Sequence, residues 1–195
     1  MQRTLTAFLS LICFGLLTPA FAAESPPMVL VDDARVIATN VGLADVAKIP
    51  AGLDRVVIDL AGGAATFVAK GMPVKTAATR MIVLQIKDAN IAQLPNVSGL
   101  PDAFPRPDGK KLFENNRVAV WDYTWTRDKP PPVHFHPRHA IVTYLGEGVM
   151  RSTGLKGDIA DSDITYGLVK SNLPDRSHSE SIVSGNVRAV IVELK

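Results

Sequence analysis

Short apolar runs broken by turn residues constrain the fold of this 195-residue chain more than any other feature. Many of these runs are rich in β-branched residues or alternate between apolar and polar positions. Such runs favour strands, and segments with helical periodicity are scarce. Short strands separated by Gly, Pro, Asn and Asp predict an all-β sandwich or barrel. The expected strands are Arg35–Thr39, Arg55–Leu60, Thr66–Ala69, Met81–Ile86, Arg117–Trp125, Ala140–Leu145, Val149–Ser152, Ile164–Val169, Ser181–Val183 and Val187–Glu193.

Three segments between the strands have a different character. Gly42–Ala47 and Ile91–Leu94 are the candidate short helices. Residues 89–111 contain four prolines and show no period, so we expect a Pro-rich linker or a wrapping loop there.

The N-terminus has the three parts of a secretory signal peptide. Arg3 supplies a positive charge, Leu5–Leu17 is an apolar run, and Ala20–Ala22 matches an A-x-A cleavage site. The run is too short and wrongly flanked for a membrane-spanning helix. We therefore expect residues 1–22 to be removed and the mature protein to be periplasmic or secreted. An uncleaved signal anchor is the alternative.

Composition excludes several functions. Cys13 is the only cysteine and lies in the signal peptide, so the mature protein has neither disulfides nor thiol catalysis. The 21 basic and 19 acidic residues nearly balance and form no basic block, which argues against nucleic acid as a partner. No later segment is apolar for long enough to cross a bilayer, so we expect no membrane contact after signal cleavage.

Three short blocks of the sequence occur twice in the chain, in the same order. The matching pairs are Arg35–Ile37 with Arg117–Ala119, Gly52–Gly63 with Pro137–Gly148, and Arg80–Lys87 with Arg188–Lys195. A duplication explains this order, whereas the alternative is that apolar strands ending at glycine resemble one another by composition. The first copy contains no histidine.

All four histidines lie in the second half, and three of them, His134, His136 and His139, fall within six residues. Residues two apart in a strand point to the same face, so His134 and His136 can direct two imidazoles into one cavity. Neutral imidazoles suit several divalent metals, among them Zn, Fe, Mn and Ni. An exposed pair without metal is the alternative for these two residues alone.

The surroundings of these histidines resemble the cupin family. From Pro132 to Gly148 the chain is similar to the first cupin motif, in which H-x-H precedes a glutamate, a strand and a Gly-rich hairpin. Pro174–His178 resembles the second motif, Pro-x-Gly-x-x-His, whose histidine completes the site. The resemblance covers about Leu112–Lys195.

This resemblance implies an all-β fold with a cupin-type double-stranded β-helix, or jelly-roll barrel, at residues 112–195. It implies one divalent transition metal (Fe, Mn, Zn or Ni) on His134, His136 and His178. Residues 28–88 would then be a reduced, degenerate cupin-like repeat without metal ligands. That copy would cover a sheet edge, half-close the barrel or drive homodimer formation.

Two positions depart from the family pattern. The glutamate of the first motif falls at Ala140 or Ile141, neither of which binds metal, and Arg176 replaces the glycine of the second motif. The fourth ligand is therefore His139, Glu180 or water.

Further residues near the motifs have more than one interpretation each. His139 is a fourth ligand or proton donor, a residue that donates a hydrogen bond to a metal ligand, or a solvated turn residue. Tyr144 is a proton donor near the metal, or it packs in the core with its hydroxyl bonded. Arg138 and Arg176 bind a carboxylate substrate, or they are exposed loop residues.

Two functions follow from this pattern. In the first, an exported cupin-domain protein binds one metal and a small polar ligand without turnover. In the second, a mononuclear metal enzyme of dioxygenase, isomerase or hydrolase type acts on a small polar molecule, with His139 or Tyr144 as catalytic proton donor. A structural barrel whose histidines are relics is a third interpretation.

Overall fold

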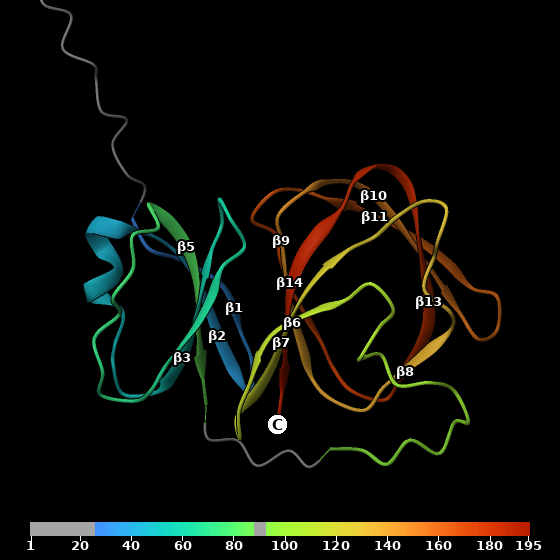
Figure 1. Ribbon diagram of the computed structural model, residues 1–195, viewed down its shortest axis with the longest axis horizontal. Coiled ribbons are helices and arrows are strands. Elements are labelled where there is room, and N and C mark those ends of the chain that lie inside the picture. The colour runs from blue at the N-terminus through green and yellow to red at the C-terminus, as the bar shows by residue number, and fades with distance from the viewer. Residues whose placement is uncertain (1–25, 88–92) are drawn as a thin grey trace, which may run out of the picture.

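The computed structural model describes residues 26–87 and 93–195, and strands dominate it (Figure 1). The all-β prediction is confirmed. The expected signal peptide, residues 1–22, lies outside the described residues. The candidate helix Ile91–Leu94 lies partly outside them, and its residues 93 and 94 form no helix. No helix in the described part of the chain is long and apolar enough to cross a membrane.

The first half forms one five-stranded antiparallel sheet, the N-terminal sheet, with strand order β1-β2-β5-β3-β4. A short 3-10 helix, η1 (Leu43–Lys48), replaces the helix expected at Gly42–Ala47. The strands are β1 (Met28–Asp32), β2 (Val36–Gly42), β3 (Asp54–Asp59), β4 (Ala65–Val68) and β5 (Arg80–Ile86).

The second half is a barrel of two antiparallel sheets. The middle sheet has the order β12-β9-β14-β7-β6, and the histidine sheet has the order β11-β10-β13-β8. The strands are β6 (Lys110–Glu114), β7 (Val118–Thr124), β8 (His134–His136), β9 (Ala140–Tyr144), β10 (Glu147–Gly154), β11 (Ile159–Ile164), β12 (Val169–Asn172), β13 (Arg176–Asn186) and β14 (Arg188–Leu194). The prediction of a strand at Ile164–Val169 is wrong. Strand β11 ends at Ile164, a turn follows, and β12 begins at Val169.

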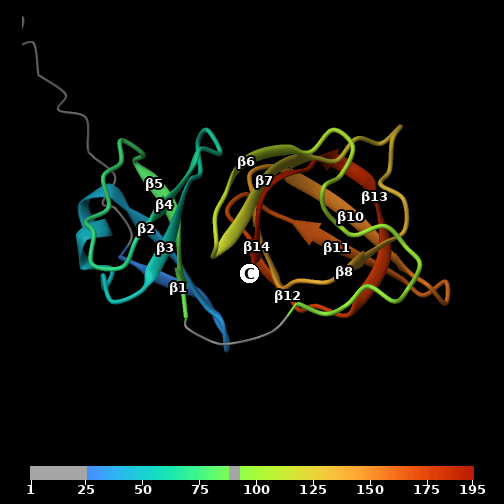
Figure 2. The ribbon, with the colours of Figure 1, turned by 60° about the horizontal axis from the view of Figure 1, so that its bottom comes forward.

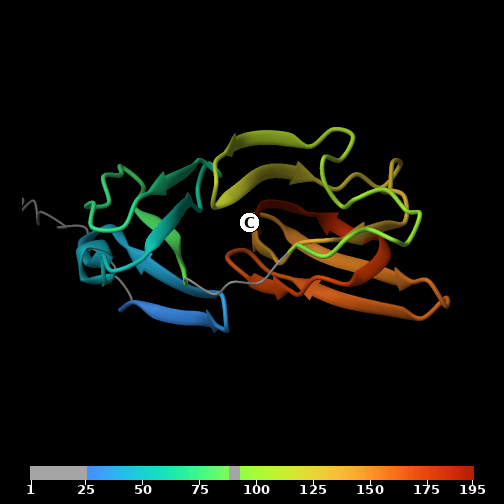
Figure 3. The ribbon, with the colours of Figure 1, turned by 90° about the horizontal axis from the view of Figure 1, so that it is seen from below.

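The middle sheet is buried on both faces. On β14, Val190, Val192 and Leu194 belong to a core that includes residues of the N-terminal sheet, such as Ile58 and Leu84. The alternate residues Ala189 and Ile191 belong to the core inside the barrel. Because side chains alternate between the faces of a strand, one strand serves both cores. The N-terminal sheet thus covers the outside of the barrel (Figure 3).

The other face of the N-terminal sheet has a much smaller cover. Val41, Val57 and Val83 pack there with Val46 and Ile49, which come from η1 and the residue after it. This side of the sheet therefore has no second sheet opposite it among the described residues.

The N-terminal sheet and the middle sheet have equivalent topology. In each, the last strand in sequence, β5 or β14, lies in the centre between the strands formed by the other two repeated blocks. The edge hairpins agree in register, since β1 has its bulge between Val29 and Val31 and β6 has its bulge between Lys111 and Phe113. A duplication explains these matches, and the reduced repeat itself stays a prediction, as does dimer formation.

Equivalent turns also hold the two sheets together. Asp33 caps the β1–β2 turn by accepting bonds from the backbone N–H groups of Arg35 and Val36, and Asn115 caps the β6–β7 turn in the same way. The Arg35 guanidinium donates to the Lys195 carbonyl at 3.0 Å, and that of Arg117 donates to the Lys87 carbonyl at 3.5 Å. The contacts are reciprocal, as in an interface between two equivalent subunits.

The Pro-rich segment is a wall of the barrel. Phe135 of β8 donates its N–H to the carbonyl of Pro101 at 2.9 Å, and its carbonyl accepts the N–H of Ala103 at 2.7 Å. The segment therefore pairs with the otherwise open edge of β8 and runs past it (Figure 2). In the described part of residues 89–111, the segment runs along β8 and its last two residues, Lys110 and Lys111, begin β6.

We predict that removal of Val190–Lys195 unfolds the protein. The deletion takes most of β14, which pairs with β7 on one side and β9 on the other, and it removes side chains from both cores. Circular dichroism and thermal melting of the purified truncation measure the effect. A near-native spectrum with a cooperative melt would contradict the prediction.

Candidate metal centre

Three imidazoles converge inside the barrel. His134 and His136 come from β8 and His178 from β13, and His178 lies directly opposite His134 in the antiparallel pair. The Nε2 atom of His136 lies 3.2 Å from that of His134 and 3.0 Å from that of His178. All three side chains are buried, with exposed fractions of 2 to 5%. In residues 26–87 and 93–195 they are the one such group of potential metal ligands.

The protonation of these histidines favours metal binding. His134 Nδ1 donates to the carbonyl of Pro132 at 2.8 Å, so in the neutral ring the lone pair is on Nε2 and faces the other two rings. Burial, together with the neighbouring His134 and His178, lowers the pKa of His136 to about 3. Burial likewise lowers the pKa of His178 to about 4, although Glu180 opposes the shift. The rings are neutral at pH 7.

The spacing of the three Nε2 atoms fits a metal ion. Two imidazole nitrogens bound at about 2.0–2.1 Å to one ion are separated by roughly 2.9–3.4 Å. The two separations of 3.0 and 3.2 Å fall in this range. The Ser152 hydroxyl orients the other ring nitrogen of His178, Nδ1, which lies 2.9 Å from it. Residues that orient ligands in this manner are typical of metal centres.

An ion pair lies against the histidines. Arg106, from the segment that pairs with β8, places Nη1 at 2.9 Å from Oε2 of Glu180 and Nη2 at 2.9 Å from Nε2 of His134. The indole Nε1 of Trp125 also donates to Oε2 of Glu180, at 3.0 Å. The other carboxylate oxygen, Oε1, lies 3.8 Å from Nε2 of His178.

The charges of this pair are stabilised by their surroundings. Burial by itself raises the pKa of Glu180, but the Arg106 guanidinium and the histidines outweigh it, and the pKa is about 2. Arg106 packs its guanidinium 4.7 Å from the ring centre of Phe104 and 5.1 Å from that of Tyr123. Glu180 is therefore an anion in contact with the histidine cluster.

Tyr144 lies near the cluster. It lines a small cavity of about 40 Å³ together with Lys170, Arg176 and Glu180. Burial raises the pKa of the Tyr144 phenol, so it stays protonated at neutral pH. Arg176 donates to the Ser152 hydroxyl at 3.2 Å, next to His178.

The structure does not bring His139 and Arg138 to the cluster. His139 Nε2 lies 2.6 Å from the Ser171 hydroxyl, which donates to Asp33 Oδ2 at 2.6 Å. This chain of contacts joins the barrel to the β1–β2 turn of the N-terminal sheet. Arg138 is bonded to Gln93 on the surface.

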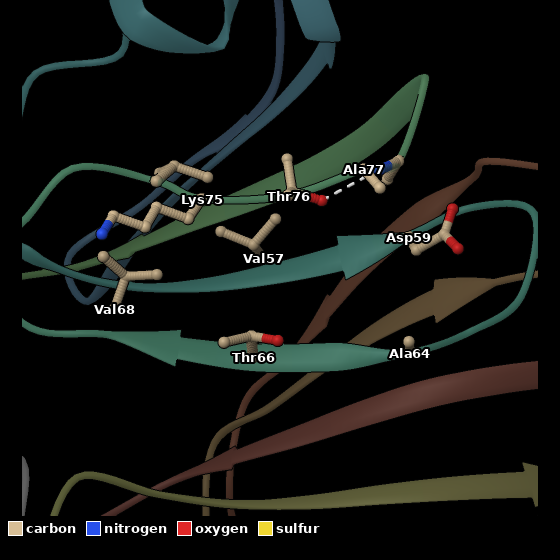
Figure 4. Close-up of a pocket in the computed structure, with 10 residues that line it drawn as sticks. Val57, Asp59, Ala64, Thr66, Val68, Lys75, Thr76 and Ala77 are labelled. Atoms are coloured by element: carbon tan, nitrogen blue, oxygen red, sulfur yellow. Dashed lines mark hydrogen bonds between the residues drawn. The ribbon is translucent and has the colours of Figure 1, made fainter.

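A second cavity, of about 290 Å³, lies on the outer face of the N-terminal sheet (Figure 4). Its lining is mostly Val, Ala and Thr, with Asp59 and Lys75, and includes no histidine. The Asp59 carboxylate accepts backbone bonds from Ala61 and Gly62, so it is already used in the turn. This cavity has no cluster of metal ligands.

Several solved structures of cupin proteins are similar to this chain in fold, in keeping with the resemblance that the sequence predicts. Among solved structures, a cupin-domain protein from Bordetella pertussis is similar, with a TM-score of 0.41 and 18% identity over 49% of this chain and 96% of its own. A cupin 2 conserved barrel domain protein from Leptotrichia buccalis matches with a TM-score of 0.45 and 13% identity, over 92% and 93% of the two chains.

A mutant of oxalate decarboxylase from Bacillus subtilis matches with a TM-score of 0.38 and 10% identity, over 89% of this chain and 78% of its own. At such identities the likeness concerns the fold alone. Protein-family models and curated proteins give no match to this chain.

Sequence reasoning did not find Arg106, Ser152 or the indole bond of Trp125. No motif marks Arg106, which lies in a Pro-rich segment far from the histidines in sequence. Ser152 could have been found only by predicting that its strand, β10, pairs with β13, which carries His178.

We predict that His139 stabilises the fold in a pH-dependent manner. Burial lowers its pKa from 6.5 and Arg35 adds to this, while Asp33 opposes it. Below about pH 6.5 the unfolded chain binds a proton at His139 that the folded protein resists, so this part of the stability falls with pH. The difference in unfolding free energy between wild type and His139→Gln should therefore shrink between about pH 7.5 and pH 5.

Urea denaturation at several pH values measures this difference. A Lys156→Gln variant, at an exposed turn, serves as control and should show a constant difference from wild type. A difference for His139→Gln that does not change with pH would contradict the prediction.

Proposed function

We propose that this chain binds one divalent transition-metal ion through His134, His136 and His178 and presents it to a small polar ligand. The observation that carries the proposal is the convergence of three neutral, buried Nε2 atoms at 3.0 and 3.2 Å. Three protein ligands leave further coordination positions for water or a ligand. When bound, the metal supplies a Lewis-acid centre for a bound water or anion.

The protein residues around the cluster suit a small anionic or polar ligand. Lys170 and Arg176 line the same cavity as Glu180, and the Lys170 ammonium lies 5.9 Å from the ring centre of Tyr144. These cations attract an anionic group, while Tyr144 presents a protonated phenol as hydrogen-bond donor.

A metal-dependent enzyme is the second candidate function. It is favoured by Tyr144, whose protonated phenol lines the cavity next to the cluster and can donate a proton. Oxygen uptake and product formation with a panel of small polar molecules distinguish turnover from binding. Loss of turnover in Tyr144→Phe with metal binding retained would support the enzyme.

We predict about one metal ion per chain in protein purified without an affinity tag and supplied with Fe, Mn, Zn or Ni. His134→Ala and His136→Ala should lose it, because each removes one of three ligands. Elemental analysis by mass spectrometry gives the stoichiometry. His139→Gln is the matched control and should keep the metal, since His139 is bonded to Ser171 away from the cluster.

Absence of metal from the wild type after supplementation with all four ions would refute the proposal. Equal loss in His139→Gln and in the cluster variants would also count against this ligand set.

We also propose that the protein is exported. The signal at residues 1–22 supports this, and the mature chain should begin at Ala23. Intact-mass analysis of the protein from the periplasm or culture medium tests the cleavage site. A full-length chain that stays in the cytoplasm would contradict export.

A further inference from the structure

Arg106 touches both the histidine cluster and its neighbouring carboxylate, and no motif in the sequence accounts for it. We propose that Arg106 is a built-in competitor of the metal, and that Glu180 is shared between them: paired with Arg106 in the metal-free protein and a fourth ligand of the bound ion. This inference deepens the proposed function and rests on it.

The position of Glu180 on β13 places its carboxylate beside the histidine cluster. Glu180 follows His178 by two residues, so both side chains point from the same face of the strand into the barrel. Its Oε1 atom is already 3.8 Å from the Nε2 atom of His178. A carboxylate thus stands beside the cluster, although the first-motif positions Ala140 and Ile141 provide none.

Two hydrogen bonds orient the Glu180 carboxylate toward the cluster. Trp125 Nε1 and Arg106 Nη1 both donate to Oε2 of Glu180, at 3.0 and 2.9 Å. Two donors on one oxygen fix the plane of the group and leave Oε1 on the side of His178. Hydrogen bonds of this kind orient carboxylate ligands in metal centres.

Competition follows from the lone pair of His134. Its Nδ1 proton is donated to Pro132, so Nε2 has one lone pair, and this lone pair accepts from Arg106 Nη2 at 2.9 Å. A guanidinium has no acceptor and cannot exchange roles with the ring. A metal ion needs the same lone pair, so the ion and the Arg106–His134 hydrogen bond exclude each other.

Arg106 can lose this one contact without leaving its place. Its Nε atom donates to the carbonyl of Ala103 at 2.9 Å, and its guanidinium lies over the ring of Phe104. Ala103 in turn pairs with Phe135 between the two β8 histidines. The competing cation is therefore held within reach of the site by the wall of the barrel.

Opposite effects on metal affinity are expected for the two residues. Arg106→Met removes a positive charge and the competing donor and leaves Glu180 without its cation, so Co²⁺ alone should bind about 10-fold more tightly. Glu180→Gln removes an anion and a ligand and leaves Arg106 unpaired, so Co²⁺ should bind about 10–100-fold more weakly. Isothermal calorimetry on metal-free protein measures both.

The double variant Arg106→Met/Glu180→Gln keeps the proposal testable if a single variant fails to fold, because the double variant leaves no unpaired buried charge. Compared with Arg106→Met, it isolates the carboxylate, and it should bind Co²⁺ more weakly. Glu193→Gln is the matched control. Glu193 is also a buried carboxylate that accepts a tryptophan bond, from Trp121 at 3.0 Å. It lies on β14 of the middle sheet and not in the histidine sheet, so its loss should leave Co²⁺ affinity unchanged.

The absorption spectrum of bound Co²⁺ distinguishes a ligand from a mere nearby charge. At saturating Co²⁺ the visible bands of Arg106→Met and of the double variant should differ, because one ligand is replaced. Identical spectra would overturn the ligand role of Glu180. Unchanged or weaker binding in a folded Arg106→Met would overturn the competition.

Failure of the proposed function has a different signature. In that case wild type and Arg106→Met bind no Co²⁺ at the cluster, and His136→Ala changes nothing. If wild type binds and His136→Ala does not, the metal site stands whatever the outcome for Arg106 and Glu180.

Discussion

Strand β14 alternates between two cores, and this double burial holds the molecule together. Its even-numbered residues, such as Val192, pack toward the N-terminal sheet, and its odd-numbered residues, such as Ile191, pack inside the barrel. Because the middle sheet is a wall of both cores, neither half can shift its register without exposing apolar side chains of the other. The reciprocal bonds of Arg35 and Arg117 add fixed polar contacts at the same boundary.

The metal centre depends on this frame through the opposite wall of the barrel. The histidine sheet contributes all three imidazoles, while the middle sheet fills the interior with Trp121, Tyr123 and Tyr144. Burial is the largest cause of the low pKa values of His136 and His178. The local charges around these neutral imidazoles therefore come from the Arg106–Glu180 pair and from Arg176.

Much of the fold was predictable, because buried strands such as β5 and β14 are continuous apolar runs. The spacing of His134 and His136 predicted their shared face, and motif order brought in His178. Edge strands such as β6 and β11 were missed because exposed polar residues hide their pattern. Glu180 was only one of several candidates, and Arg106 was not found, since its position results from pairing between the Pro-rich segment and β8, which local sequence does not encode.

The small cover on the far face of the N-terminal sheet limits what this half of the molecule can become. A six-residue 3-10 helix stands where the barrel has an entire second sheet. An enclosed interior requires a sheet on each side. The first half has one sheet, and the short helix η1 with its neighbours covers part of the outer face. Histidines substituted into β2 or β3 would therefore face η1, the barrel or the cavity of Figure 4, and no second sheet would carry further ligands opposite them. Only an insertion long enough to build a second sheet would give this half an interior of its own.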